Sequence, residues 1–482
     1  MKQILFYTFL SYILISFSSC FSPTGELTGR KTTRLDFQTE KPYGMLEVPQ
    51  GSFTMGGNDQ DVPYANMRDL KTVTISPFWI DQTEITNDEY RQFTHWVRDS
   101  IIRRELIDME GGEKWGWTND PSPNWNQQVL GEDQGRTEDY YINWSKPLNY
   151  QKAKVTEAMV STLVFQEGDQ LAGEGSGDVI HRPHFQSKLI DSRRLIYEYS
   201  WFNPDKAGSR NNRYDYEEER YLEIERADAF VVKERVPVYP DTLTWVHDFT
   251  YNFNEPMFDK YFWHPAYGDY PVVGVSWKQA KAFCHWRTEW KLYWMPEERR
   301  QFETPYRLPT EAEWEWAARG GRELAMYPWG GPYSRNYEGC FLANFKPLRG
   351  NYYADGYIYT APAVSYNYND YGLYNMAGNV SEWTESAYNP MSDIFASDLN
   401  PEYTYNADNS DHPHFKKKVV KGGSWKDIGA FLQIGARDYE YQDSSRCYVG
   451  FRCVKSYGYD PSKGQFNNQY TPPKKKKNKK NK

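Results

Sequence analysis

The sequence predicts an α+β fold of short elements, with long insertions and low regular secondary structure. Segments of alternating apolar and polar residues have the pattern of β-strands, and other segments with apolar residues at helical spacing begin at N-capping residues. Long stretches rich in Tyr, Trp and Asn separate them. Aromatic residues make up 17% of the 482 positions, which is ample material for the core of such a domain. A mean hydropathy of −0.85 excludes a polytopic membrane protein.

The first structured region begins near Tyr43. Residues 45–49 and 51–56 read as a strand, a turn and a strand, and residues 72–75 alternate as a further strand should. A helix is predicted over residues 88–99 with Asn87 as its N-cap, because aromatic and apolar residues recur at helical spacing there.

The middle of the chain has a different composition. Residues 101–265 are rich in Tyr, Trp, Asn and charge and have few aliphatic runs, so they form either a long insertion or a small second domain. A second helix is predicted to start at Ser276, and residues 288–305 look like a smaller insertion. Thr310 followed by Glu313 has the spacing of a capping box, which predicts a third helix.

The N-terminus has the features of a bacterial lipoprotein signal. Lys2 precedes a short apolar region, residues 4–17, which leads to Ser18, Ser19 and Cys20. We therefore expect a signal peptide over residues 1–19, lipidation of Cys20, and a polar tether over residues 20–41 before a domain at 42–460. The next two residues after Cys20, Phe21 and Ser22, are not acidic, so the expected location is the outer membrane, anchored by lipid on its periplasmic face. An ordinary secretory signal cut elsewhere is the alternative.

The charge distribution argues against nucleic-acid binding. Seven lysines lie within the last nine residues, 474–482, and subtracting them from the net charge of −8 leaves −15 on residues 1–473. An acidic body lacks the basic face that nucleic acid requires. Residues 461–482 are rich in Pro, Lys and Asn and are predicted to be a disordered tail.

Four further cysteines remain after Cys20. An exported chain with four cysteines suggests up to two disulfides, for which three connectivities exist. The closely spaced histidine pairs lie in polar stretches that read as solvated loops, so a transition-metal site is not expected. The four cysteines are Cys284, Cys340, Cys447 and Cys453.

Several motifs in fixed order carry a resemblance to a known family. They are residues 51–56, 84–87, 307–316 and 371–383, followed by Gly422-Gly423-Ser424 and by Gly450-Phe451-Arg452-Cys453. Together they resemble the formylglycine-generating-enzyme fold, or sulfatase-modifying-factor domain, a variant of the C-type-lectin-like fold. The resemblance covers roughly residues 43–100 and 268–456, and it implies a single domain interrupted by insertions.

The chain also resembles the GldK/PorK family of gliding-motility lipoproteins. The lipobox, residues 25–29, residues 41–45, residues 83–93 and the large insertion after the first helix carry this likeness. The resemblance implies a ring component of the type IX protein secretion and gliding motility machinery. It further implies a homo-oligomeric ring in the periplasm and a GldN/PorN-like periplasmic partner. Peptidoglycan is a further candidate partner, because lectin-like folds use calcium and aromatic residues to bind sugars.

The reactive centre of the enzymes in this family is a pair of thiols just past the glycine pair. Counted from Gly422, those positions hold Asp427 and Leu432, and neither a carboxylate nor an isobutyl group replaces a thiolate. The resemblance therefore implies a pseudoenzyme with no copper and no catalytic residues. The alternatives are a calcium-dependent glycan-binding or peptidoglycan-binding module and a formylglycine-generating oxidase.

The family's calcium ligands and its structural disulfide can be carried over by position. The disulfide would join Cys284 to Cys453, which leaves Cys340 and Cys447 either as a second bridge or as free thiols. Calcium prefers hard oxygen ligands on loops. One implied site uses Asn344, Phe345, Asp355 and Tyr357, and the other uses Asn375, Gly378, Val380 and Glu382.

Overall fold

The structure is a computed structural model. It describes residues 41–57, 70–110, 115–117, 128–129, 140–165, 189–203, 214–215, 220–221, 231–248, 255–296, 300, 303–347 and 350–457. The predicted signal peptide, Cys20, the tether up to residue 40 and the lysine-rich tail lie outside the described residues. No helix among the described residues has both the length and the apolar character needed to cross a bilayer.

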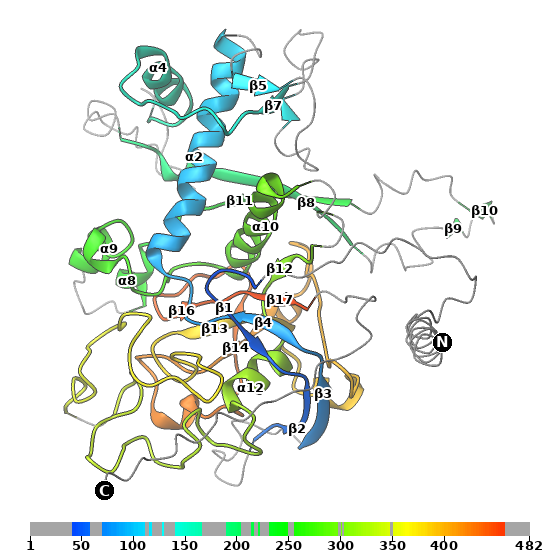
Figure 1. The fold of residues 1–482 in the computed structure, drawn as a ribbon, viewed down its shortest axis with the longest axis vertical. Coiled ribbons are helices and arrows are strands. Elements are labelled where there is room, and N and C mark those ends of the chain that lie inside the picture. Colours follow the sequence, from blue (N-terminus) through cyan, green and yellow to red (C-terminus); the bar gives the residue numbers. More distant parts are fainter. Residues whose placement is uncertain are drawn as a thin grey trace, which may run out of the picture. The chain divides into compact units, whose positions relative to one another are not determined.

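One four-stranded sheet joins segments that are far apart in the sequence (Figure 1). Its strand order is β1-β4-β17-β12, and every pairing is antiparallel. Strand β17, the last described strand in the sequence, lies between β4 and β12. The sheet is therefore complete only when β17 has paired with both of them. The strands are β1 (Met45–Val48), β4 (Phe78–Asp81), β12 (Tyr306–Arg307) and β17 (Val454–Ser456).

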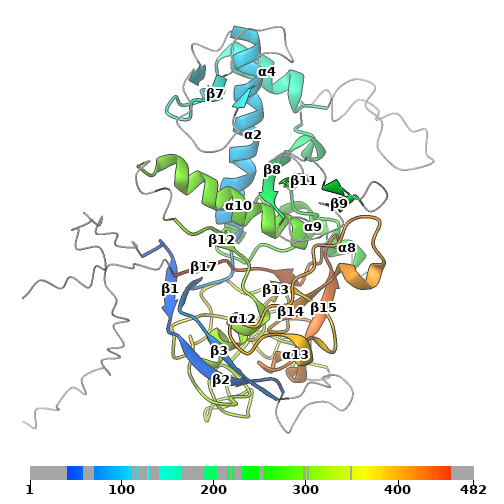
Figure 2. The same ribbon diagram turned by 90° about the vertical axis from the view of Figure 1, so that its right-hand side faces the viewer.

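A second four-stranded sheet has the order β15-β14-β13-β16, in which β13 and β16 run parallel. Helix α12 (Glu311–Arg319) lies next to β13 and β14 in both Figure 1 and Figure 2, and all of its residues are buried. Strand β13 is therefore covered along most of its length. The strands are β13 (Ser381–Ala387), β14 (Lys417–Lys421), β15 (Asp438–Tyr441) and β16 (Val449–Gly450).

Two of the predicted helix starts are confirmed. Helix α10 (Trp277–Trp294) begins with a capping box between Ser276 and Gln279, and α12 begins with one between Thr310 and Glu313. Helix α10 continues to Trp294, so the insertion predicted to start at residue 288 was placed too early.

The first helix in the structure differs from the predicted helix, residues 88–99, at both ends. Helix α2 runs from Asn87 to Glu110, because Ile102, Leu106 and Ile107 extend its buried face well past residue 99. Its N-terminal cap is Thr86, whose backbone N–H donates to Glu89 Oε2 at 2.9 Å, and not Asn87. The side chain of Asn87 is instead used in a long-range contact.

The described parts of the 101–265 region share a core with helices α2 and α10. This core contains Trp115, Ile142, Val155 and Tyr197 from the region together with residues such as Phe93 and Phe283. Buried apolar side chains of the region therefore pack on the helices that flank it. The elements are β5 (Gly116–Trp117), β6 (Gln128–Val129), β7 (Tyr140–Ile142), α4 (Ala153–Thr162), β8 (Ile196–Phe202), β9 (Tyr214–Asp215), β10 (Arg220–Tyr221), β11 (Val231–Pro237), α8 (Thr244–His247) and α9 (Glu255–Lys260).

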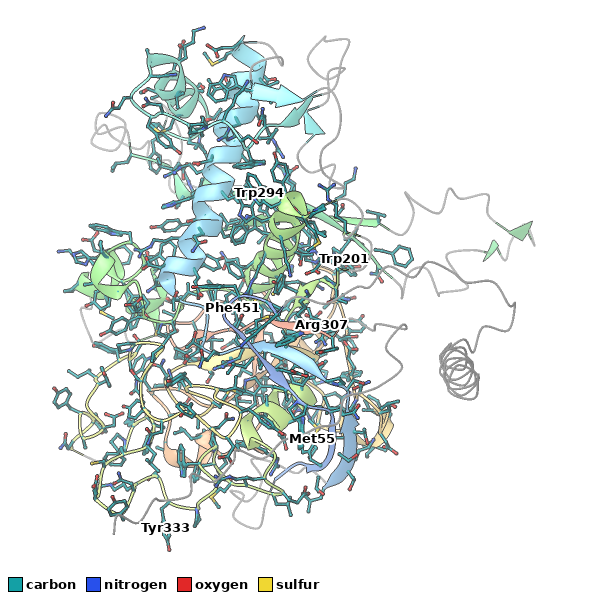
Figure 3. The ribbon with its side chains drawn as sticks, in the orientation of Figure 1. Met55, Trp201, Trp294, Arg307, Tyr333 and Phe451 are labelled. Atoms are coloured by element: carbon teal, nitrogen blue, oxygen red, sulfur yellow. The ribbon has the colours of Figure 1, made fainter. Side chains whose placement is uncertain are left out.

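The remaining elements are small. Strands β2 (Gly51–Met55) and β3 (Lys71–Ile75) form a separate antiparallel pair, as the sequence pattern predicted. Short helix α13 (Ser392–Phe395) lies between the second sheet's first two strands in the sequence. Figure 3 shows Phe451 in the interior near α10, where its ring packs at 5.4 Å from that of Phe283.

Candidate functional site

The loop that follows β14 holds the two positions that replace the family's thiols. Gly422 and Gly423 lead out of β14 with positive φ angles of 93° and 67°. At Gly423 an added Cβ would lie 2.8 Å from the carbonyl oxygen of Phe431, so this close approach requires glycine. The chain then forms a 3-10 turn, Gly429–Leu432, and returns as β15.

Both replacing residues have structural contacts. Asp427 Oδ2 accepts hydrogen bonds from the backbone N–H of Ser424 at 3.0 Å and from the Ser424 hydroxyl at 2.5 Å, which closes a turn. Leu432 is fully buried in a small cluster with Tyr327 and Phe345. Neither side chain can act as a thiolate nucleophile or as a soft metal ligand.

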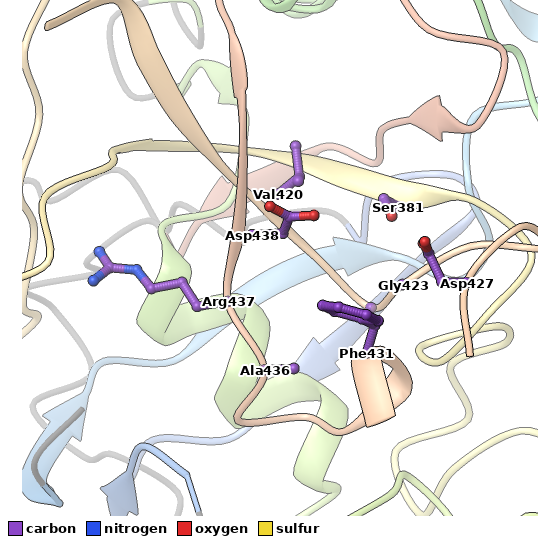
Figure 4. A pocket seen from close by; sticks show the side chains of 9 residues that line it. Ser381, Val420, Gly423, Asp427, Phe431, Ala436, Arg437 and Asp438 are labelled. Atoms are coloured by element: carbon purple, nitrogen blue, oxygen red, sulfur yellow. The ribbon is translucent and has the colours of Figure 1, made fainter. Parts of the chain in front are cut away.

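A small pocket opens beside this loop (Figure 4). The guanidinium of Arg437 points away from it, because it pairs with Glu311 at 2.9 Å and donates to Ser392 Oγ at 2.9 Å. The charged side chains left facing the pocket are the carboxylates of Asp427 and Asp438. The lining residues are Ser381, Val420, Gly422, Gly423, Asp427, Phe431, Ala436, Arg437 and Asp438.

The first set of predicted calcium ligands includes two buried side-chain oxygens that accept no hydrogen bond from the described residues. Asn344 Nδ2 donates to the carbonyl oxygen of Tyr359 at 2.8 Å, which leaves Asn344 Oδ1 buried with no partner among the described residues. Asp355 Oδ2 accepts from the N–H of Phe345 at 2.8 Å, and its Oδ1 is likewise buried and unpartnered within the described part of the chain. Buried acceptors of this kind are costly unless something satisfies them. These residues therefore fit a calcium ion.

Electrostatics support the same reading of this site. Burial raises the pKa of Asp355 above its ordinary value, although backbone N–H groups at Phe345 and Tyr357 act in the opposite direction. A cation beside the carboxylate would favour its charged form. Bound calcium would be held by the side chains of Asn344 and Asp355 and the carbonyls of Phe345 and Tyr357, and would fix this loop.

The second set of predicted calcium ligands does not fit a cation. Both oxygens of Glu382 already accept from Arg452, at 2.5 and 2.7 Å, and Oε2 also accepts from Trp314 Nε1 at 2.7 Å. Asn375 turns its Nδ2 toward Glu84 at 3.1 Å. A calcium ion beside a guanidinium would be repelled, so we expect the internal ion pair of Glu382 and Arg452 here in place of a calcium ion. Gly378 and Val380 lie in the same loop, and both are buried.

Arg452 and Glu84 are the residues that motif-by-motif reasoning missed. Arg452 also donates to the carbonyl oxygens of Tyr374 at 3.0 Å and Asp81 at 3.2 Å, so it gathers oxygens as a bound cation would. Burial raises the pKa of Glu84 to about 7, while Arg452 opposes the shift. Both residues belong to motifs noted in the sequence, but their electrostatic interaction joins motifs more than 300 positions apart.

The four described cysteines are free thiols in this structure. Cys284 and Cys453 are both buried with sulfur atoms 3.5 Å apart, so the predicted partners are neighbours but are not bonded. Cys340 is exposed, Cys447 is buried beside Trp425, and they form no second bridge. Within the described ranges, no group of three or more His, Cys, Asp and Glu residues is placed to hold a metal ion.

Lys418 on β14 is a buried lysine whose titration should make the stability of the protein depend on pH. It is fully buried, with Nζ 2.8 Å from the carbonyl oxygen of Tyr405 and 3.7 Å from the ring centre of Trp277. Burial lowers its pKa from 10.5 to about 7. Below pH 7 the penalty for burying the charge is present in full. Between pH 7 and 10.5 the folded chain has released a proton that the unfolded chain retains, so stability rises with pH.

We expect the free energy of unfolding to rise by about 2–3 kcal/mol between pH 6 and 9 relative to the Lys418→Met variant. Urea unfolding of both proteins at the two pH values measures this difference. Parallel pH profiles for the two proteins would show that Lys418 does not titrate in this way.

Comparison with known proteins identifies the class. A match to the family described as "Sulfatase-modifying factor enzyme 1-like domain" covers residues 32–457, and the chain belongs to this family.

Three relatives illustrate the similarity. The formylglycine-generating enzyme of Bos taurus is 35% identical over 195 residues, or 39% of this chain and 45% of that protein. The inactive C-alpha-formylglycine-generating enzyme 2 of Bos taurus is 32% identical over 199 residues, covering 40% and 52%. The formylglycine-generating enzyme of Thermomonospora curvata is 36% identical over 195 residues, covering 39% and 55%. The aligned region thus spans about half the length of these relatives.

Among solved structures, that of PvdO from Pseudomonas aeruginosa is similar with a TM-score of 0.40 and 16% identity. The similarity covers 86% of this chain and 94% of that one.

Proposed function

We propose that this protein is a non-catalytic member of its family and serves as a structural component. The observation that carries the proposal is the state of the two thiol positions. Asp427 closes a turn through Ser424, and Leu432 is buried in the core, so both have been absorbed into the scaffold. The existence of a relative named as an inactive formylglycine-generating enzyme supports the idea that the fold persists without the reaction.

The proposed setting is the periplasmic face of the outer membrane. Lipidated at Cys20, the protein would assemble into the ring of the type IX secretion and gliding machinery with a GldN/PorN-type partner. Heterologous contacts between identical subunits that close on themselves produce such rings. The lipobox and the ordered motifs of the sequence are the support for this part of the proposal.

A copper measurement tests the loss of catalysis. We expect the purified protein, incubated with Cu(I), to retain no stoichiometric copper and to leave a cysteine-containing peptide unchanged, because the two positions after the glycine pair carry no thiol and the neighbouring thiols of Cys284 and Cys453 are buried. Metal analysis and mass spectrometry of the peptide give the readout, with a formylglycine-generating enzyme as the positive control. Copper bound one to one, together with conversion of the peptide, would overturn the proposal.

The assembly role needs a separate readout. Lipid-free protein mixed with the partner is expected to elute as large particles in size-exclusion chromatography with light scattering. Exposed tyrosines that shortly precede Asn344 in the sequence, among them Tyr333 at 76% and Tyr337 at 96%, favour glycan binding as the second candidate function, and Figure 3 shows Tyr333 at the edge of the molecule. A monomer that ignores the partner but is retained by peptidoglycan until calcium is chelated would favour that alternative.

A further inference from the structure

The pocket beside β14 combines negative charge with an unused hydroxyl. Ser381 is only 6% exposed, lines the pocket, and its Oγ has no hydrogen-bond partner among the described residues. Asp427 and Asp438 lie around the same space in Figure 4. Neither carboxylate forms an ion pair with a described basic side chain. The nearby Lys426 instead places its Nζ over the ring of Tyr448, 3.3 Å from the ring centre.

The two acids influence each other across the pocket. Asp438 is exposed by surface area, but desolvation by the surrounding protein atoms still raises its pKa, and the negative charge of Asp427 raises it further, while the Tyr439 N–H and Lys426 act in the opposite direction. Each carboxylate has one oxygen engaged locally, Asp427 Oδ2 with Ser424 and Asp438 Oδ1 with the N–H of Tyr439 at 2.8 Å. The other oxygen of each is available to a donor.

The remaining wall of the pocket suits a cation. Phe431 is partly exposed and forms one side, where an aromatic face can attract a positive charge. The one cationic side chain in the lining, Arg437, is directed away and neutralised by Glu311. The space is small, which fits a compact ammonium group better than a planar guanidinium.

We propose that this pocket binds the side-chain ammonium of a lysine, held by Asp427, Asp438 and Ser381 against Phe431. The inference rests on the proposed non-catalytic function, since it assigns a binding role to the place where the family's thiols would stand. Two sources can supply such a lysine, a peptide segment of a partner protein or the lysine-rich residues 474–482 of another copy of this chain.

A peptide-binding experiment tests the pocket. The probe is a synthetic fluorescent peptide with the sequence of residues 474–482, titrated by anisotropy into the full-length chain at physiological salt. We expect Asp438→Asn and Asp427→Asn each to weaken binding about tenfold, because each removes a charge-assisted hydrogen bond. The matched control is Glu338→Gln, which removes one exposed carboxylate outside the pocket and should change binding less than about twofold.

Two further arms make the result specific. The same peptide with acetylated lysines should not bind, and carbodiimide coupling followed by mass spectrometry should join peptide lysine to Asp427 or Asp438. Replacement of the seven tail lysines by glutamine in the full-length chain distinguishes the two sources. If self-association of the chain falls after this replacement, the bound lysine comes from the tail of another copy. If self-association is unchanged while the probe still binds, the lysine comes from a partner protein.

Three outcomes would overturn the inference. They are equal weakening by Glu338→Gln, unchanged binding of the acetylated peptide, and competition by millimolar calcium that shows the pocket to be a cation site. Failure here is separate from failure of the proposed function, because copper retention and partner assembly are measured without the peptide. Unfolding temperatures of the variants establish that a loss of binding is not a loss of fold.

Discussion

Replacing Arg452 with methionine will lower the free energy of unfolding by about 3–5 kcal/mol, because it leaves buried carboxylates without their cation. Arg452 and Glu382 are both fully buried and joined by two hydrogen bonds of 2.5 and 2.7 Å. Glu84, also fully buried, relies on the same guanidinium to offset the cost of its burial. Urea unfolding monitored by tryptophan fluorescence gives the measurement.

The control is the same substitution at an exposed ion pair. Arg322 pairs with Asp370 on the surface, where both side chains are nearly half exposed. Arg322→Met should therefore cost less than about 1 kcal/mol. The double variant Arg452→Met with Glu382→Gln should regain part of the loss, because it removes one of the stranded charges. Equal costs at the buried and exposed pairs would refute the central role assigned to Arg452.

Calcium will stabilise the protein through one site and not two. At a free concentration one hundred times its Kd, calcium should raise the free energy of unfolding by about 3 kcal/mol. Asp355→Asn should abolish this response, because it removes the site's one carboxylate while keeping its shape. Thermal unfolding with calcium and with chelator measures the response, and native mass spectrometry counts the ions.

The contrasting variant lies at the second predicted site. Glu382→Gln should leave the calcium response intact while lowering the baseline stability, since Glu382 serves Arg452. Magnesium in place of calcium should have a much smaller effect, because it demands stricter geometry and keeps its own water ligands. Two bound ions, or loss of the calcium response in Glu382→Gln, would restore the second site and exclude the ion-pair interpretation.

Local signals in the sequence predicted local structure well. The helix cap at Ser276 and the capping box at Thr310 were predicted correctly, since a cap depends on residues three positions apart. The extent of α2 was underestimated, because the Ile102, Leu106 and Ile107 stripe becomes meaningful only when neighbouring segments cover it. The family resemblance, confirmed over residues 32–457, came from motifs that are each a short stretch of chain.

The calcium ligands show the limit of position-by-position reasoning. At the first site, Asn344 Oδ1 and Asp355 Oδ1 are buried without donors among the described residues, as a cation site requires. At the second, the same kind of residues are satisfied by Arg452, which lies 70 positions from Glu382. A residue's chemistry is visible in the sequence, but its partner is not, because partners are chosen by the packing of distant segments.

The amino-acid sequence by itself determined the family, the starts of helices α10 and α12, and the absence of thiols between Cys340 and Cys447, since these depend on residue identity or on short-range hydrogen bonding. Only the tertiary structure decided that Leu432 is buried, that Arg452 pairs with Glu382, and that two acids and Ser381 meet in one pocket. Burial and charge pairing depend on which distant segments come together in space. The first sheet is an example, because its strands β4 and β12 are joined only through β17, which lies near the other end of the described chain.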